Sequence, residues 1–112
     1  MTHRPPGRLA RAACAIALAA LLSPTLSQAG EQEDRLRTRS LAATCAHCHG
    51  TDGRAVQGQP LVHLAGLQQD YILTQLMAFR SGQRPATIMH QITKGYSLEQ
   101  LETLAKYFAA QK

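Results

Sequence analysis

Tryptophan is absent from this sequence of 112 residues, and three tyrosines and two phenylalanines make up its 4% of aromatic residues. A chain of this length forms one small domain at most, and the hydrophobic core of such a domain is only marginally stable by itself. A core with few large aromatic side chains has room for a bound group. The composition therefore agrees with a small domain that a cofactor helps to stabilise.

The sequence also lacks an apolar run long enough to span a bilayer comfortably, since its main apolar stretch covers only residues 12–22. Arginines at residues 4–11 precede this stretch, and small residues at 27–29 follow it. This order is typical of a secretory signal peptide. We therefore predict a cleaved signal peptide at residues 1–29 and a periplasmic domain at residues 30–112, with an uncleaved anchor as the alternative.

The positive charge gives little support to nucleic-acid binding. The whole chain has 12 Lys and Arg against 7 Asp and Glu, which gives a net charge of +5. Cleavage after residue 29 would remove three of the arginines and none of the acids, which leaves a net charge of about +2. We expect no nucleic-acid partner and, after cleavage, no membrane span.

A Cys-x-x-Cys-His motif lies at residues 45–49. Each cysteine of such a motif can form a thioether with a haem vinyl group, and the histidine directly after the second cysteine can bind the iron. The motif predicts one covalently attached haem c, with Cys45 and Cys48 as anchors and His49 as the proximal iron ligand. The third cysteine, Cys14, would leave with the signal peptide.

Two other interpretations of the motif find less support. A thioredoxin-like redox pair normally lies between a strand and a helix, and no strand-like run precedes Cys45. A structural zinc site needs four ligands, usually from a second Cys or His pair, whereas His63 and His90 stand alone. Covalent haem is the interpretation that the spacing favours.

Apolar residues at helical spacing, together with cap and breaker residues, predict an all-α domain of three to five short helices around one haem. Gly50, Gly82 and Gly95 follow the ends of three of these helices. Ser97 and Gln100 form a possible capping box at the start of the last. The predicted helices run from about Asp34 to the motif, from residue 70 to Ser81, from residue 86 to Lys94, and from Ser97 towards the C-terminus.

The sixth iron ligand decides what such a haem does. Met89 lies forty residues beyond His49, in the short predicted helix between the two longer ones, where a chain that has passed around the haem can return across it. A thioether ligand favours ferrous iron and suits an electron carrier. Met89 is the favoured ligand, and Met77, His63, His90 or an open site are the alternatives.

The proximal histidine also needs an acceptor for its Nδ1 proton, which orients the ring and strengthens the ligand. We expect a backbone carbonyl between Pro60 and Val62 to accept this proton. His90 is expected to face solvent, because neighbouring residues of a helix point about 100° apart and only one of Met89 and His90 can face the iron.

Several stretches of the sequence resemble class I cytochromes c. Within that class the chain is similar to the small periplasmic domains of bacterial dihaem cytochromes and to the cytochrome subunit of flavocytochrome c sulfide dehydrogenase. The segment from Thr87 to Ser97 is similar to the axial-methionine segment of that subunit. The stretches that carry the resemblance are Cys45–Gly50, Leu64–Gly66, Phe79–Gly82, Met89, Lys94–Ser97 and Tyr107–Phe108.

The resemblance implies thioether bonds at Cys45 and Cys48, and His49 and Met89 as the two iron ligands. The sequence differs from the family pattern at two points. Val62-His63 stands where these families commonly have a proline before the leucine, and only one haem motif is present, which excludes the full dihaem form.

The resemblance also implies a function in single-electron transfer, with redox proteins as partners and no enzymatic turnover by the protein alone. A sulfide-oxidising subunit that contains FAD is the expected electron donor. A freely diffusing carrier and a ligand-binding or peroxidatic haem protein are the alternatives. Lys94, Arg80 and Arg84 are candidates for steering an acidic partner towards the haem edge.

Overall fold

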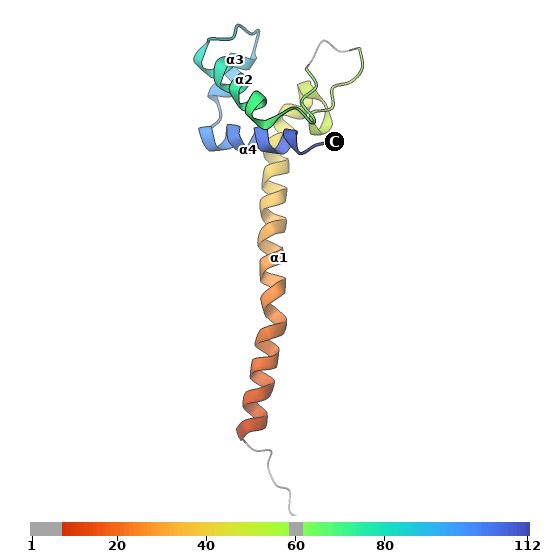
Figure 1. Cartoon of the computed structure of the whole chain (residues 1–112), viewed down its shortest axis with the longest axis vertical. Helices are drawn as coiled ribbons and strands as arrows, with labels where there is room; N and C mark the ends of the chain where they lie inside the picture. Colours follow the sequence, from red (N-terminus) through yellow and green to blue (C-terminus); the bar gives the residue numbers. More distant parts are fainter. Residues whose placement is uncertain (1–7, 59–61) are drawn as a thin grey trace, which may run out of the picture. The chain divides into compact units, whose positions relative to one another are not determined.

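The computed structural model describes residues 8–58 and 62–112, with the backbone alone for residues 8–27. The chain divides after Arg35 into two compact units, and helix α1 runs from the first into the second. The second unit, Leu36–Lys112, carries the haem motif and the other helices (Figure 1). The elements are α1 (Arg8–His49), the short 3-10 turn η1 (Thr51–Gly53), α2 (Gln69–Ser81), α3 (Met89–Lys94) and α4 (Leu98–Ala109).

The described residues contain helices and no strand, so the predicted all-α fold is confirmed. In the same ranges, no helix has both the length and the apolar character that crossing a membrane requires.

Helix α1 begins far earlier than predicted. The sequence predicts a start near Asp34, whereas the helix begins at Arg8 and continues through Pro24, Gly30 and Asp34. Between residues 25 and 35 the chain has no proline and only one glycine. Adding a residue to an existing helix gains one hydrogen bond, so a single glycine is not enough to stop it. The predicted cleavage after Ala29 is a separate matter and stays a prediction.

Helix α2 agrees closely with its prediction. It ends at Ser81, and Gly82 caps it in the left-handed conformation with φ of 80°. The Gly82 N–H donates to the Phe79 carbonyl over 3.2 Å, which satisfies one of the carbonyls left free at the helix end. Ile72 is buried on the inner face of the helix.

Helix α4 begins with the predicted capping box. The Ser97 hydroxyl accepts from the Gln100 N–H over 3.1 Å, and the Gln100 side chain accepts from the Ser97 N–H over 2.8 Å. Both bonds satisfy donors that the first turn of a helix leaves free. The helix then buries four residues of its apolar stripe: Leu101, Leu104, Ala105 and Phe108.

Helix α3 is shorter than predicted. It begins at Met89 instead of residue 86, so Met89 is its first residue. It ends at Lys94 as predicted, but Gly95 has φ of −74°, which is right-handed, and not the left-handed conformation usual for a glycine after a helix. The N–H of Gly95 still bonds back to the Ile92 carbonyl over 3.1 Å.

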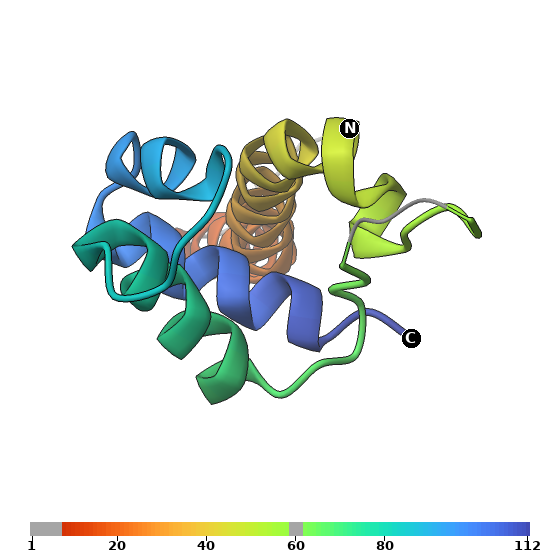
Figure 2. The same cartoon turned by 90° about the horizontal axis from the view of Figure 1, so that it is seen from above.

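The hydrophobic core of the second unit lies between α2, α4 and the end of α1. Helix α2 packs against both α3 and α4, and Figure 2 shows α2 and α4 side by side. Partly buried residues pack against this core, among them Cys45 near the end of α1 and Leu64 in the loop between η1 and α2. The buried core residues are Ala42, Ile72, Leu101, Leu104, Ala105 and Phe108. The haem motif therefore lies on the border of this core.

Candidate functional site

The two cysteines of the motif occupy the last turns of α1, three residues apart and hence on neighbouring positions of one helix face. Both are free thiols; Cys45 is half-buried against the core, and Cys48 is exposed. Burial raises the pKa of the Cys45 thiol. A redox-active dithiol needs a lowered pKa instead, so this environment disfavours the thioredoxin-like interpretation.

The imidazole of His49 is held by the loop that follows the motif. Its Nδ1 lies 2.8 Å from the Val62 carbonyl oxygen, thirteen residues away. Because a carbonyl oxygen only accepts, Nδ1 carries the proton and donates it, which leaves Nε2 with a free lone pair. The predicted acceptor region is confirmed at Val62; Pro60, at its other end, lies outside the described residues. His49 is thus oriented and has the tautomer that a metal ligand needs.

Gly50 turns the chain directly after His49. It has φ of 80°, and a Cβ atom there would lie 1.9 Å from the Arg54 carbonyl oxygen. Its N–H donates to the Ala46 carbonyl over 2.9 Å and closes the last turn of α1. Only glycine allows this reversal, which turns the chain back after the motif.

The turn after Gly50 is bonded to the loop that carries Val62. The Gly53 carbonyl accepts from the N–H groups of Leu64 and Ala65 over 2.8 Å and 3.2 Å. Gly53 is buried, and a Cβ atom there would lie 2.8 Å from Cδ1 of Phe108. This close packing holds the loop near Val62 in place opposite His49.

Met89, the predicted distal ligand, is half-buried at the start of α3. Its carbonyl accepts from the Thr93 hydroxyl over 2.9 Å. Ile88, directly before Met89, and Ile92, three residues after it, expose 56% and 41% of their surfaces. An apolar, partly exposed segment of this kind can cover one face of a cofactor, and the role of Met89 as a ligand stays a prediction.

The sequence of most of the second unit matches a known protein family. The family model for cytochrome c matches residues 37–111. The chain belongs to the cytochrome c family. The predicted resemblance to class I cytochromes c is therefore confirmed.

Individual cytochromes show the same similarity. The chain is 35% identical over 89 residues to the cytochrome subunit of sulfide dehydrogenase from Chlorobaculum tepidum, which covers 80% of this chain and 79% of the relative. It is 36% identical to cytochrome c-552 of Acidithiobacillus ferridurans over 65% of this chain and 31% of the relative. A solved structure of cytochrome c4 from Acidithiobacillus ferrooxidans matches with a TM-score of 0.54 and 38% identity, over 59% of this chain and 38% of that one. The chain thus spans well under half of these two longer cytochromes.

Cytochromes c carry covalently bound haem c and transfer electrons. The residues of this cytochrome fit the group: the motif offers two free thiols, and His49 offers one free ring nitrogen while the other is engaged. Among the described residues, no group of three or more His, Cys, Asp and Glu side chains could hold a separate metal ion.

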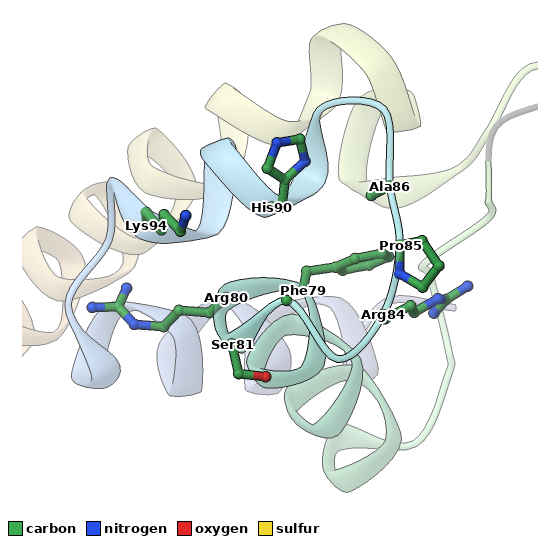
Figure 3. A pocket seen from close by; sticks show the side chains of 9 residues that line it. Phe79, Arg80, Ser81, Arg84, Pro85, Ala86, His90 and Lys94 are labelled. Carbon is green, nitrogen blue, oxygen red and sulfur yellow. The ribbon is translucent and has the colours of Figure 1, made fainter.

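The other candidate ligands of this cytochrome lie in different surroundings. His63 is exposed in the loop, and Met77 exposes 37% of its surface on α2. His90 is half-buried, and its Nδ1 is buried without a partner among the described residues. His90 is expected from the sequence to face solvent, and for its Nδ1 atom this expectation is wrong. His90 lines a shallow pocket of about 300 Å³ between α2 and α3 (Figure 3).

Two of the three predicted docking residues are engaged inside the domain. The Arg80 side chain donates to two backbone carbonyls, and the Arg84 guanidinium lies 4.6 Å from the centre of the Phe79 ring and bonds to Gln75. Both guanidinium groups hold their own domain together, which the sequence could not show. Lys94 is exposed and keeps its predicted role as a candidate.

A polar pair joins the turn after the motif to α4. The Tyr107 hydroxyl donates to the Asp52 carboxylate across 55 positions of sequence, and Arg54 lies 3.4 Å from the same carboxylate. The Tyr107 bond lowers the pKa of Asp52, with a smaller contribution from the charges of Arg39 and Arg54. Burial, with the bond to Asp52, raises the pKa of Tyr107. Sequence reasoning missed this pair, because only the fold brings residues 52 and 107 together.

We expect Gly50→Ala to destabilise the folded cytochrome by about 3 kcal/mol, because the new Cβ meets the Arg54 carbonyl and a non-glycine residue is strained at this φ. Gly58→Ala is the matched control: its φ is 82°, but no atom of the described residues lies within 4 Å of the Cβ position. It should cost only the backbone strain, about 1 kcal/mol. Urea unfolding followed by circular dichroism measures both, and equal losses would contradict the role of the clash.

We expect the bond between Asp52 and Tyr107 to make stability depend on pH at the acidic end. The folded-state pKa of Asp52 is lowered, so its stabilisation is present above the unfolded pKa of about 3.9 and is lost as the pH falls through the folded pKa. Asp52→Asn should therefore be less stable than the wild type at pH 6, and the difference should shrink below about pH 4. Urea unfolding at a series of pH values tests this, and a constant difference would refute it.

Proposed function

We propose that Cys45 and Cys48 bind one haem covalently, that His49 through Nε2 and Met89 bind its iron, and that the protein transfers single electrons. The bond from His49 Nδ1 to the Val62 carbonyl carries the proposal, because it leaves Nε2 free at the correct place after the two thiols. When bound, the haem supplies an iron that gains and loses one electron.

The chain's own residues have supporting tasks in this proposal. The Val62 carbonyl holds the Nδ1 proton of His49 and keeps the ring in one tautomer. The apolar side chains beside Met89 exclude water from its side of the site. No side chain is needed as acid, base or nucleophile, so we propose no turnover by this protein alone.

We further propose that the protein is the electron-accepting subunit of a sulfide-oxidising flavoprotein in the periplasm, after cleavage of residues 1–29. The similarity to the cytochrome subunit of the Chlorobaculum tepidum enzyme supports this, because it extends over 79% of that subunit. The signal-like order of residues 4–29 supports export.

Haem attachment and cleavage are tested on the protein expressed with its full N-terminus in a bacterial host that attaches haem c. We expect a haem-positive band on a denaturing gel, an intact mass with one haem, and an N-terminus at Gly30. A band without haem, or haem that dissociates on denaturation, would refute covalent attachment; an intact residue 1 would refute cleavage.

The partner is tested by tagging the protein at its C-terminus in its native host and identifying what co-purifies. An FAD-containing protein that reduces the haem in the presence of sulfide is the expected result. Free monomer, with reduction by sulfide that needs no flavoprotein, would overturn this assignment, and an isolated complex with an oxidase would favour the freely diffusing carrier.

A further inference from the structure

The segment that follows Met89 is tied to α2 by one arginine. Arg80 Nη1 donates to the carbonyls of Thr93 and Tyr96 over 2.8 Å and 2.7 Å. In Figure 3 the Arg80 side chain extends from α2 towards the chain beyond Lys94. Helix ends leave carbonyls unpaired, and a charged donor bonds them more strongly than a neutral one. Arg80 therefore fixes the end of α3 and the link to α4.

The same link is tied to α1 by a tyrosine. Tyr96 Oη lies 2.6 Å from Thr44 Oγ1, and the Thr44 hydroxyl also bonds to the Leu41 carbonyl over 2.7 Å. A carbonyl only accepts, so the single Thr44 proton goes to Leu41, and the Tyr96 hydroxyl donates to Thr44. Thr44 directly precedes Cys45. This bond thus joins the helix that carries the haem motif to the chain beyond Met89.

Helix α3 packs against α2, but it is too short to hold its own position by helix hydrogen bonds. It has six residues, and its N-cap Ile88 makes no side-chain cap bond. A helix this short is not stable by its own hydrogen bonds. Thr93, 1% exposed, links its two ends, because its hydroxyl donates to the Met89 carbonyl and its own carbonyl accepts from Arg80. In addition to the packing of α3 against α2, the bonds of Arg80 and Tyr96 therefore help to fix the position of Met89.

We propose that Thr44, Arg80 and Tyr96 are positioning residues for Met89. We call these three residues the bracket. It holds α3 at a fixed place relative to the end of α1, so that the thioether of Met89 stays close enough to bind the iron. This inference rests on the proposed function, because it assumes that Met89 is the distal ligand.

The test measures how readily added imidazole displaces Met89 in the ferric holoprotein. Tyr96→Phe removes one hydrogen bond, which should raise the apparent affinity for imidazole about fivefold. Arg80→Met removes two bonds from a charged donor and should raise it by about tenfold or more. In both variants the weak near-infrared band of methionine ligation should bleach at a lower imidazole concentration.

Matched controls separate positioning from general loosening. Tyr71→Phe removes a hydroxyl from a tyrosine that is 51% exposed on α2, and Thr103→Val removes a bond confined to α4. Both should bind imidazole like the wild type. Thr44→Val removes the bond to Tyr96 and also the bond to the Leu41 carbonyl within α1, so its effect should equal or exceed that of Tyr96→Phe; the double variant should add nothing to Thr44→Val alone, because the bond between the two residues is already lost. Arg80→Lys should restore part of the wild-type behaviour, since it keeps a charged donor.

Two results would overturn the inference. Bracket variants that unfold more easily but bind imidazole like the wild type would show a role in stability alone. Fully additive effects of Thr44→Val and Tyr96→Phe would show that the bond between them is not what matters. Met89→Ala distinguishes this failure from that of the proposed function: a near-infrared band that persists in this variant would mean that Met89 is not the ligand.

Discussion

The double variant Cys45→Ala, Cys48→Ala is expected to lose its haem on denaturation and to fold poorly without it. Only six hydrophobic residues are buried in the core of the described domain, and two of them are alanines. Such a core needs a covalent staple, and losing one costs a small domain about 2–5 kcal/mol where the staple is a disulfide. A haem stain after a denaturing gel and thermal unfolding by circular dichroism measure the two effects.

The single variants should differ from one another. Cys45 is half-buried against the core, whereas Cys48 is exposed. Cys45→Ala therefore loses packing as well as a thioether and should be the less stable of the two, while each variant keeps one covalent link.

Cys14→Ala is the matched control, because cleavage after residue 29 would remove this cysteine from the mature protein. We expect wild-type haem content and stability. Covalent haem that survives the double substitution would contradict the assigned anchors, and a loss of haem in Cys14→Ala would contradict the predicted signal peptide.

The sequence is a good guide where local chemistry decides the structure. The capping box of Ser97 and Gln100 involves residues three apart, and Gly82 adopts the left-handed conformation that ends α2. The acceptor of the His49 proton could also be predicted to within a few residues, because the loop that follows a haem motif must return past the histidine.

The sequence is a poor guide where distant residues meet. The charge of Arg80 suggested docking, but its guanidinium bonds to carbonyls that only the packing of α2 against α3 brings within reach. In the same way, nothing in the turn around Asp52 indicates a tyrosine 55 residues away. The early start of α1 is a different case, because the helix continues through both Pro24 and Gly30, the residues expected to interrupt it.

Met89→Ala is expected to lower the reduction potential of the haem by on the order of 0.2 V, a part of the roughly 0.8 V range over which axial ligands set it. The thioether favours ferrous iron, so its loss stabilises the ferric form. The near-infrared band should disappear, and imidazole should bind without first displacing a protein ligand. Redox titration and ferric spectra measure these changes.

Two substitutions complete this prediction. Met77→Ala is the matched control: this methionine is 37% exposed on α2 and should leave the potential and the band unchanged. His90→Ala tests the neighbouring alternative, whose Nδ1 is buried without a partner among the described residues. If Met89→Ala left the potential unchanged and His90→Ala altered it, histidine would be the distal ligand. Because imidazole ligation lacks the preference of a thioether for ferrous iron, such a site would have a lower potential from the outset.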